Sequence, residues 1–434
     1  MKHVHFLGIG GSGTSAAAAI AQAQGYKISG CDKDPQADFL KFFPKEQIFI
    51  EHSPKHLKGV NILATTPAVF SLDPHNPELL EAQKRGLEVL TWQEFMGKYL
   101  EKDKFVIAIC GTHGKTTTTA MSSLLLEEAK FDPTVELGSV IPQWGTNYRI
   151  GKGKPVLSGV EGYFITEADE FSDNFLASHP DITILTSVEM DHPEFFKDFT
   201  DYKKSFQKFL SQTKKTIIAN LANSGVKEVL ASHSSSGNTK IIDYSDKLID
   251  FPLQVLGQFN ILNASAVYQL GLALGINPEI IKKSLSSYQG TGRRFEYLGK
   301  VGKTEIYSDF GHHPTEIKLT IKAAREKFSD KKILLVFQPH MFSRTKALFT
   351  DFVKVLSNVP VDKTYLLDIY PSREIDTGLV SSQELVEAVN KPNFRYLEKE
   401  KIKETLHHEA SDYDIIIFMG AGDIDKIARG FVNQ

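Results

Sequence analysis

Two glycine-rich segments of the chain each stand between an apolar run and a helical stretch, where a phosphate group could bind. The later segment reads Gly111-Thr112-His113-Gly114-Lys115-Thr116. Backbone N–H groups in such a turn point at phosphate oxygens, and the N-terminus of the next helix adds partial positive charge. We expect Lys115 to reach the β and γ phosphates of ATP, and the Thr116 hydroxyl to bind Mg²⁺. Ile109 stands where the strict pattern has glycine, so this is a variant loop, and a turn with an incidental lysine is the alternative.

The earlier glycine-rich segment matches the G-x-G-x-x-G pattern of dinucleotide-binding loops. An aspartate at the end of the next apolar run follows about twenty residues further on, as that pattern requires. The residues predicted to surround a diphosphate are Gly8, Gly10, Gly11, Ser12, Gly13 and Asp32. Because a separate triphosphate loop follows later in the chain, we expect this loop to hold the UDP of a nucleotide-sugar. An NAD site and a turn that binds nothing are the alternatives.

Acidic and histidine residues follow two further apolar runs. Glu167, within Thr166-Glu167-Ala168-Asp169-Glu170, ends one predicted strand, and His192, within Ser187-Val188-Glu189-Met190-Asp191-His192, follows the next. The carboxyl ends of strands line the ligand crevice in open α/β sheets. We therefore expect Glu167 and His192 to meet Mg²⁺ near the phosphates, where phosphoryl transfer needs charge neutralised. Helix capping is the alternative role for these side chains.

These segments need strands and helices that alternate along the chain, and the apolar pattern predicts them. Alternation of this kind indicates an α/β protein with parallel sheets. Charge clustering near residue 102 and a glycine- and arginine-rich stretch near residue 294 predict three domains, at residues 1–102, 103–294 and 295–434. The first and third are predicted to be Rossmann-like and the second a phosphate-loop domain. The predicted strands are 3–9, 27–30, 60–64, 87–90, 105–109, 163–166, 182–186, 216–219, 303–308, 333–338, 363–367 and 415–419, and the predicted helices include 14–23, 77–85 and 260–274.

Composition argues against a nucleic-acid-binding protein, a disulfide-rich protein and a membrane-spanning protein. The 434 residues carry a formal net charge of −3, which gives no electrostatic footprint for nucleic acid. Two cysteines, Cys31 and Cys110, are too few for a disulfide scaffold and fit a reducing compartment. We find no run of about 18 apolar residues, so no membrane span is expected. A cytoplasmic protein is the prediction.

Taken in order, several stretches resemble the Mur ligases, the ATP-dependent ligases of bacterial cell-wall precursor synthesis. The stretches are HFLGIGGSG (5–13), GTHGKTTTTAM (111–121), TEADE (166–170), SVEMDH (187–192), FNILNA (259–264), FGHHPTE (310–316), FQPHMFSRTK (337–346) and GAGDI (420–424). The resemblance implies a UDP-sugar-binding first domain, an ATP-binding second domain and an amino-acid-binding third domain. It also implies a ligase that adds L-alanine to the lactyl carboxylate of UDP-N-acetylmuramate through an acyl phosphate.

The resemblance further implies residue roles. Lys115, Glu167, His192 and Arg344 would act in catalysis, and two Mg²⁺ ions would lie at Thr116, Glu167 and His192. ATP would contact Gly111, Thr112, His113, Gly114, Lys115, Thr116, Thr117, Asn263, Arg294 and Asp309. The amino acid would meet His312, His340 and Arg344.

Two features keep other functions open. Phe310 stands where the alanine-adding members usually carry tyrosine, and residues 190–199 look closer to a branch that joins a whole tripeptide to the same UDP-sugar. A murein-peptide recycling ligase is therefore the alternative within the family. Outside it, an NAD-dependent dehydrogenase and a nucleotide-binding regulator without chemistry are the alternatives.

Overall fold

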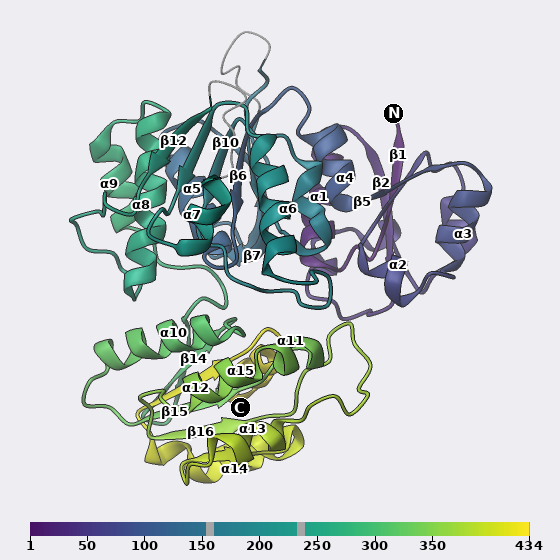
Figure 1. Ribbon diagram of the computed structural model, residues 1–434. Coiled ribbons are helices and arrows are strands. Elements are labelled where there is room, and N and C mark those ends of the chain that lie inside the picture. Colours follow the sequence, from purple (N-terminus) through teal and green to yellow (C-terminus); the bar gives the residue numbers. More distant parts are fainter. Residues whose placement is uncertain (153–159, 232–238, 434) are drawn as a thin grey trace. The chain divides into compact units, whose positions relative to one another are not determined.

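The computed structural model describes residues 1–152, 160–231 and 239–433, and the chain divides into two compact units. The first unit comprises Met1–Glu189, Phe199–Phe251 and Leu262–Ser287, and the second comprises Met190–Asp198, Pro252–Ile261 and Tyr288–Gln434. Within the described residues, two sheets lie in the first unit and one in the second (Figure 1). All three are mainly parallel with flanking helices, which confirms the predicted fold class. The predicted domain boundaries at residues 102 and 294 stay predictions.

The first sheet, in the order β3-β2-β1-β4-β5, carries the earlier glycine-rich loop. β1 is buried along its whole length because it lies at the centre of a parallel sheet covered on both faces. Its strands and helices are β1 (His3–Leu7), α1 (Ser12–Ala23), β2 (Lys27–Asp32), η1 (Leu40–Phe42), η2 (Lys45–Gln47), β3 (Ile48–Ile50), η3 (Pro54–Leu57), β4 (Ile62–Thr65), α2 (Ala68–Leu72), α3 (Pro77–Lys84), β5 (Glu88–Thr91), α4 (Trp92–Phe95) and η4 (Met96–Leu100).

The second sheet, in the order β12-β11-β10-β6-β9-β7-β8, carries the later loop between β6 and α5. Only β8 runs antiparallel to its neighbour among the described strands of this sheet. Its strands and helices are β6 (Phe105–Cys110), α5 (Lys115–Glu128), β7 (Thr134–Ile141), β8 (Thr146–Arg149), β9 (Tyr163–Glu167), η5 (Phe171–Ala177), β10 (Ile182–Leu185), α6 (Phe199–Ser211), β11 (Thr216–Ala219), α7 (Ser224–Ala231), β12 (Lys240–Asp243), α8 (Gln258–Ala273) and α9 (Pro278–Ser286).

A shared core joins the first two sheets within the first unit. Val4 and Phe6 of β1 belong to the same buried cluster as Val106 of β6 and Phe164 of β9. The alanines of α1 occupy the space between because their small side chains let the helix approach both sheets closely. Asn147 of β8 donates a 2.7 Å hydrogen bond to the Ser12 carbonyl at the start of α1. The two phosphate-binding candidates are therefore set on one packed body.

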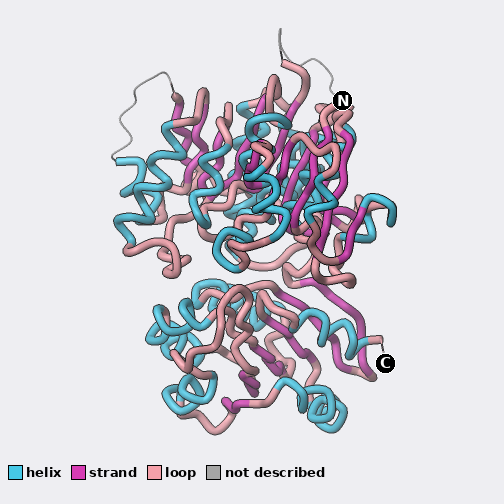
Figure 2. The backbone as a smooth tube through the Cα atoms, turned by 90° about the vertical axis from the view of Figure 1, so that its right-hand side faces the viewer, coloured by secondary structure: helices cyan, strands magenta, loops and turns pink. Residues whose placement is uncertain are grey.

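The third sheet, in the order β13-β14-β18-β15-β16-β17, forms the core of the second unit. β13 pairs antiparallel with β14, and the other described pairs are parallel. Figure 2 draws the helices in cyan and the strands in magenta. The strands and helices of the second unit are β13 (Glu296–Val301), β14 (Thr304–Asp309), α10 (Pro314–Lys327), β15 (Ile333–Phe337), α11 (Phe342–Ala347), α12 (Phe349–Leu356), β16 (Lys363–Leu366), α13 (Ser382–Val389), β17 (Phe394–Tyr396), η6 (Lys399–Lys401), α14 (Ile402–Glu409), η7 (Ala410–Asp412), β18 (Ile415–Met419) and α15 (Ile424–Val432).

Strands that the sequence did not predict lie mostly at sheet edges. β3, β8, β12, β13 and β17 are all edge strands, and β7 lies beside β8. An edge strand buries less of its surface than a central one, so it lacks the continuous apolar run that marks β6 or β18. Among the described residues, no helix combines the length and the apolar character that crossing a membrane would require.

Candidate active site

The loop between β6 and α5, residues 111–116, has the backbone geometry of a phosphate-binding turn. Gly111 and Gly114 adopt φ values of 128° and 84°, which side chains disfavour. A Cβ on Gly111 would lie 2.2 Å from Thr186 Oγ1, and one on Gly114 would lie 2.6 Å from Asn263 Oδ1. Any larger residue at either position would strain the backbone and would also clash with a neighbouring side chain.

Lys115 opens α5 and is held by acidic residues that follow β9. Its Nζ lies 2.7 Å from Glu170 Oε2, 2.7 Å from the Gly111 carbonyl and 4.0 Å from Asp169 Oδ1. Burial disfavours the ammonium form, but Glu170 and Asp169 outweigh it and raise the pKa of Lys115 above its usual value. Lys115 is therefore a fixed cation at the loop, a role that suits binding of phosphate oxygens.

Thr116 and Glu167 meet at the same loop. The Thr116 hydroxyl donates a 2.7 Å hydrogen bond to Glu167 Oε1, while Gly138 N–H donates to Glu167 Oε2 at 2.9 Å. The carboxylate thus points at the loop, as the sequence predicted. A hydroxyl and a carboxylate oxygen placed together are donors that Mg²⁺ prefers.

Hydrogen bonds from neighbouring segments brace the rest of the loop. Thr112 Oγ1 contacts the Glu189 carbonyl and the Tyr202 hydroxyl, each at 3.0 Å. Tyr202 in turn donates to Glu170 Oε1 at 2.9 Å, so Lys115 and Thr112 share one network. The His113 N–H donates to Ser187 Oγ at 3.0 Å. Thr117 is buried in the first turn of α5.

The predicted adenine contact, Asn263, lies on α8 against the phosphate loop. Its amide is the group that a Cβ on Gly114 would meet. The structure therefore brings together six of the predicted residues in the first unit, namely Gly111, Gly114, Lys115, Thr116, Glu167 and Asn263. Glu170 and Tyr202, which complete this network, were not predicted as site residues. Glu170 had a signal, because it ends the same acidic stretch, whereas Tyr202 lies inside an ordinary amphipathic helix.

The earlier glycine loop, residues 8–13, is held by β2. The N–H groups of Gly8 and Ile9 donate to the Cys31 carbonyl at 2.9 and 3.1 Å, and Gly10 N–H donates to Asp32 Oδ2 at 2.9 Å. A Cβ on Gly10 would fall 2.6 Å from the Ala37 side chain. Asp32 thus braces the loop, in addition to any contact with a ligand.

A groove of about 430 Å³ opens beside this loop. Its lining includes Gly8, Gly10, Gly11 and Asp32 but neither Ser12 nor Gly13. Ser12 instead begins α1, and a Cβ on Gly13 would lie 2.2 Å from Trp92. These two residues fit a packing role, while the first three glycines remain the candidates for diphosphate contact.

In the second unit, Arg344 forms a buried ion pair with Asp191. The guanidinium is 2% exposed, and its Nε lies 2.8 Å from Asp191 Oδ1. Arg344 is therefore not a surface charge. Despite burial, Arg344 and the neighbouring histidines hold the pKa of Asp191 well below its usual range. Asp191 was not among the predicted site residues, because nothing in its spacing links it to position 344.

His340 and His312 lie beside this ion pair. Arg344 Nη1 is 3.0 Å from His340 Nδ1, and arginine can only donate, so that ring nitrogen accepts. The ring centroids of His312 and His340 are 5.6 Å apart. Burial and the charge of Arg344 lower the pKa of His312 to about 4, and burial with His312 and Arg344 lowers that of His340 to about 2. Both rings are therefore neutral at physiological pH and offer hydrogen bonds without charge.

His192 belongs to the second unit, whereas Thr116 and Glu167 belong to the first. Its Nδ1 lies 3.1 Å from Glu194 Oε1, and its Nε2 lies 3.9 Å from Asp191 Oδ2. Its backbone has a φ of 56°, and its N–H donates to Asp191 Oδ1 at 2.7 Å. His192 and Arg344 therefore share Asp191 as a neighbour.

Arg294 and Asp309 lie at the turn that enters the third sheet. The guanidinium of Arg294 lies 5.1 Å from the centre of the Phe310 ring, and Arg293 lies 4.7 Å from it. Phe310 thus offers a π face to two cations. Asp309 accepts hydrogen bonds from the N–H groups of Phe295 and Gly311 at 2.9 and 2.7 Å, so it shapes this turn. His313 caps the N-terminus of α10.

Family models match three consecutive parts of the chain. They are the Mur ligase family catalytic domain over residues 3–104, the Mur ligase middle domain over 109–245, and the Mur ligase glutamate ligase domain over 293–422.

Relatives and solved structures extend the similarity to the full length. The chain is 36% identical to UDP-N-acetylmuramate–L-alanine ligases of Clostridium tetani and Clostridium acetobutylicum, covering 100% of this chain and 98% of each relative. A crystal structure of UDP-N-acetylmuramate-alanine ligase from Thermotoga maritima matches with a TM-score of 0.78 and 24% identity, over 100% of this chain and 99% of that one. A murein peptide ligase from Psychrobacter arcticus matches with a TM-score of 0.71 and 22% identity, over 100% and 98%. The chain belongs to the Mur ligase family.

Proposed function

We propose that the chain is an ATP-dependent ligase that joins the amine of L-alanine to the lactyl carboxylate of UDP-N-acetylmuramate. The observation that carries this proposal is the phosphate loop with its fixed cation, Lys115, beside the Thr116–Glu167 pair. The full-length similarity to relatives with this printed activity supports the choice of substrates. A carboxylate is a poor electrophile, so amide formation at neutral pH needs activation by ATP.

The reaction would proceed in two displacements. A carboxylate oxygen attacks the γ phosphorus, the bond from that phosphorus to the bridging oxygen breaks, and ADP leaves. The amine of alanine then attacks the carbonyl carbon of the acyl phosphate, and phosphate leaves as one proton passes from the amine to solvent. Lys115 would offset the charge on the phosphate oxygens during the first displacement. The N–H groups of residues 111–116 would orient the triphosphate, and Asn263 would contact the adenine.

The oxygen donors at the phosphate loop fit Mg²⁺. The Thr116 hydroxyl and Glu167 Oε1 are 2.7 Å apart, and Gly138 N–H fixes the other carboxylate oxygen. Bound there, Mg²⁺ would supply charge neutralisation at the phosphates. His192, with the Asp191 carboxylate near it, is the proposed contact of a second ion. Two ions are proposed on the family resemblance.

The remaining assignments concern the two substrates. The glycine loop at Gly8, Gly10 and Gly11 would hold the UDP diphosphate in the groove beside it. Arg344 would bind the carboxylate of alanine, because a planar guanidinium suits a bidentate contact. His340 and His312 would add neutral hydrogen bonds at the same place, while Arg294 and Asp309 are assigned to the ATP side.

The test is a reconstituted reaction with UDP-N-acetylmuramate, ATP, Mg²⁺ and single amino acids. We expect ADP, phosphate and a new amide that contains alanine, measured by mass spectrometry, and no ADP when the UDP-sugar is omitted. Amide formation with the tripeptide L-alanyl-γ-D-glutamyl-diaminopimelate but not with alanine would move the assignment to murein-peptide recycling. ADP release at the same rate with and without the UDP-sugar would contradict ligation. A change in the absorbance of an added nicotinamide cofactor would instead support a dehydrogenase.

A further inference from the structure

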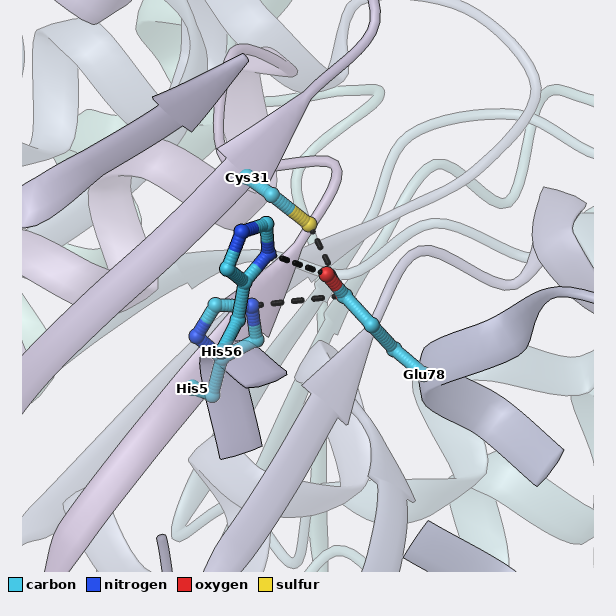
Figure 3. Close-up of side chains that lie close together, drawn as sticks. All are labelled: His5, Cys31, His56 and Glu78. Atoms are coloured by element: carbon cyan, nitrogen blue, oxygen red, sulfur yellow. Dashed lines mark hydrogen bonds and ion pairs between the residues drawn. The ribbon is translucent and has the colours of Figure 1, made fainter. Parts of the chain in front are cut away.

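A second group of potential metal ligands lies in the first sheet, apart from the phosphate loop. The side chains of His5, Cys31, His56 and Glu78 converge on one point (Figure 3). They come from β1, β2, η3 and α3, four elements spread over the first 84 residues. Their donor atoms all lie within 4.8 Å of one another. The proposed ligase reaction uses none of these four side chains.

The distances within this cluster suit a small tetrahedral site. Glu78 Oε2 lies 2.9 Å from Cys31 Sγ and 3.3 Å from His5 Nε2, and Glu78 Oε1 lies 2.6 Å from His56 Nδ1. Zinc bonds to nitrogen, oxygen and sulfur of about 2.0–2.3 Å place tetrahedral ligand atoms roughly 3.3–3.7 Å apart. A small outward movement of the donors would therefore admit the ion.

Burial and polar bonding around the cluster point to a ligand. His5, Cys31 and Glu78 are fully buried, and His5 Nε2 makes no hydrogen bond, only a 3.3 Å ion-pair contact with Glu78 Oε2. A buried ring nitrogen whose hydrogen bonding is incomplete is costly, and a cation bound between it and the carboxylate would remove that cost. The other ring nitrogen, Nδ1, lies 2.8 Å from Ser29 Oγ, which aims Nε2 into the cluster. Bonds of this kind orient histidine ligands at metal sites.

A route from solvent reaches the site at His56. This residue is the least buried of the four, with its side chain 14% exposed, and it lines an open groove with Ser53. Ser53 N–H donates to Glu78 Oε1 at 2.9 Å, which fixes the carboxylate. The ring of Phe49 stacks on His56 with centroids 4.0 Å apart. His5, Cys31 and Glu78 are thus fixed in the interior, and His56 lies at the solvent-exposed side of the cluster.

We propose that His5, Cys31, His56 and Glu78 form a structural binding site for Zn²⁺ or a similar thiophilic divalent cation. Two imidazole nitrogens, one thiolate and one carboxylate oxygen suit zinc, whereas Mg²⁺ prefers oxygen donors alone. On binding, the Cys31 thiol releases its proton to solvent and the sulfur bonds to the metal. The site links β1 and β2 to η3 and α3, which carry His56 and Glu78. Because the Cys31 carbonyl accepts two N–H groups of the glycine loop, the metal stabilises the base of that loop.

Cobalt(II) tests the site in the full-length chain, because a thiolate ligand gives Co²⁺ a charge-transfer band. Excess Mg²⁺ is present to occupy oxygen-rich sites. We expect one equivalent of Co²⁺ to produce this band with strong visible absorption of a tetrahedral ion, and Zn²⁺ to abolish both. Cys31→Ser loses the charge-transfer band. Cys110→Ser, at the other buried cysteine of the first unit, keeps it.

A second variant covers the case in which Cys31→Ser does not fold. His56→Ala removes the most exposed ligand, and we expect it to bind Co²⁺ about 10-fold more weakly or worse while its circular dichroism stays native. Zn²⁺ is also expected to raise the thermal midpoint of the unaltered chain but not that of His56→Ala. Absence of the band in the unaltered chain, its survival in Cys31→Ser, or equal affinity in His56→Ala would each overturn the proposal. The cluster would then be a network of hydrogen bonds around Glu78. None of these readings depends on ligase activity.

Discussion

Arg344 is a buried cation and Lys115 a largely buried one, with its side chain 14% exposed, and acidic partners hold both. Lys115 is paired with Glu170, which also accepts from Tyr202, so the ammonium is held close to the loop backbone. Arg344 is paired with Asp191 and also donates to His340. In both cases a carboxylate offsets the cost of burying the charge. Each cation is therefore held in place, largely desolvated, by its carboxylate partner.

At the residue scale, Lys115→Ala should lower ligase turnover by at least about 100-fold, because preorganised charge at developing phosphate charge is worth several kcal/mol. Steady-state release of phosphate measures the effect. Lys208→Ala, an exposed lysine of α6 in the same unit, is the matched control and should retain normal turnover. Circular dichroism should show both variants folded. Near-normal turnover of Lys115→Ala would remove this residue from the mechanism.

At the element scale, the phosphate loop depends on glycines where α5 begins. Gly114→Ala places a Cβ 2.6 Å from Asn263 Oδ1 at a φ of 84°, so the loop must shift. We expect affinity for a non-hydrolysable ATP analogue to fall at least about 10-fold, on top of a backbone cost of about 1–2 kcal/mol. Isothermal titration calorimetry measures the affinity.

Gly145→Ala is the control for that loop variant. Gly145 also has a positive φ, 67°, but a Cβ there would meet nothing within 4 Å. Gly145→Ala should lower the free energy of unfolding by the backbone cost alone and should bind the ATP analogue as tightly as the unaltered chain does. Equal loss of affinity in both variants would mean that strain, and not the shape of the phosphate loop, decides binding.

The junction between the first two sheets carries a pH-sensitive contact. Glu101 is buried after η4, and its Oε2 accepts from Ser178 at 2.7 Å. Burial raises the pKa of Glu101 to about 7. In the unfolded chain the carboxyl loses its proton near the ordinary pKa of 4.5. The free energy that the protonated Glu101 contributes to folding is therefore fully present below pH 4.5 and is lost as the pH rises through 7.

Glu101→Gln should therefore unfold with a higher free energy than the unaltered chain at pH 8, by on the order of 3 kcal/mol. The difference should shrink toward zero near pH 4. Urea titrations at the two values measure it, and Glu279→Gln, at an exposed glutamate of α9, serves as the control. A difference that does not change with pH would show that Glu101 ionises freely in the folded chain.

At the scale of the whole molecule, the chain leaves one compact unit and returns to it. Residues 190–198 follow β10 of the second sheet but belong to the second unit, where Asp191 meets Arg344. This pair joins positions 153 residues apart. The second unit is therefore completed by a segment from the middle of the chain.

Removing one partner of this pair tests that dependence. Asp191→Ala leaves Arg344 buried without its carboxylate and should cost about 3–5 kcal/mol of unfolding free energy in the second unit. Because the folded pKa of Asp191 is depressed, the loss should be full above pH 4 and should shrink as pH falls further. Asp330→Asn, at an exposed aspartate of the same unit, should change little. Hydrogen exchange of the third sheet measures both, and unchanged protection in Asp191→Ala would contradict the role of the pair.

Central strands and glycine-rich turns were predictable from the sequence because their signals are local. A continuous apolar run marks β6 and β18, and glycines next to lysine and threonine mark the loop after β6. The pairing of Thr116 with Glu167 was also predictable, since Glu167 ends β9 and Thr116 follows the carboxyl end of the adjacent strand β6. The roles of ATP, the amino acid and the ions rested on resemblance and stay proposals.

Only the tertiary structure decided which distant side chains share a site. Glu170 with Tyr202, Asp191 with Arg344, and His5, Cys31 and His56 with Glu78 are pairs or groups drawn from different elements. Spacing along the chain reports the face of one helix or strand, but it does not report where that face meets another element. Such meetings depend on sheet order and on the packing of the helices above it. The sequence determined the fold class and the glycine-rich turn after β6, and the folded chain decided the partners that hold each charge.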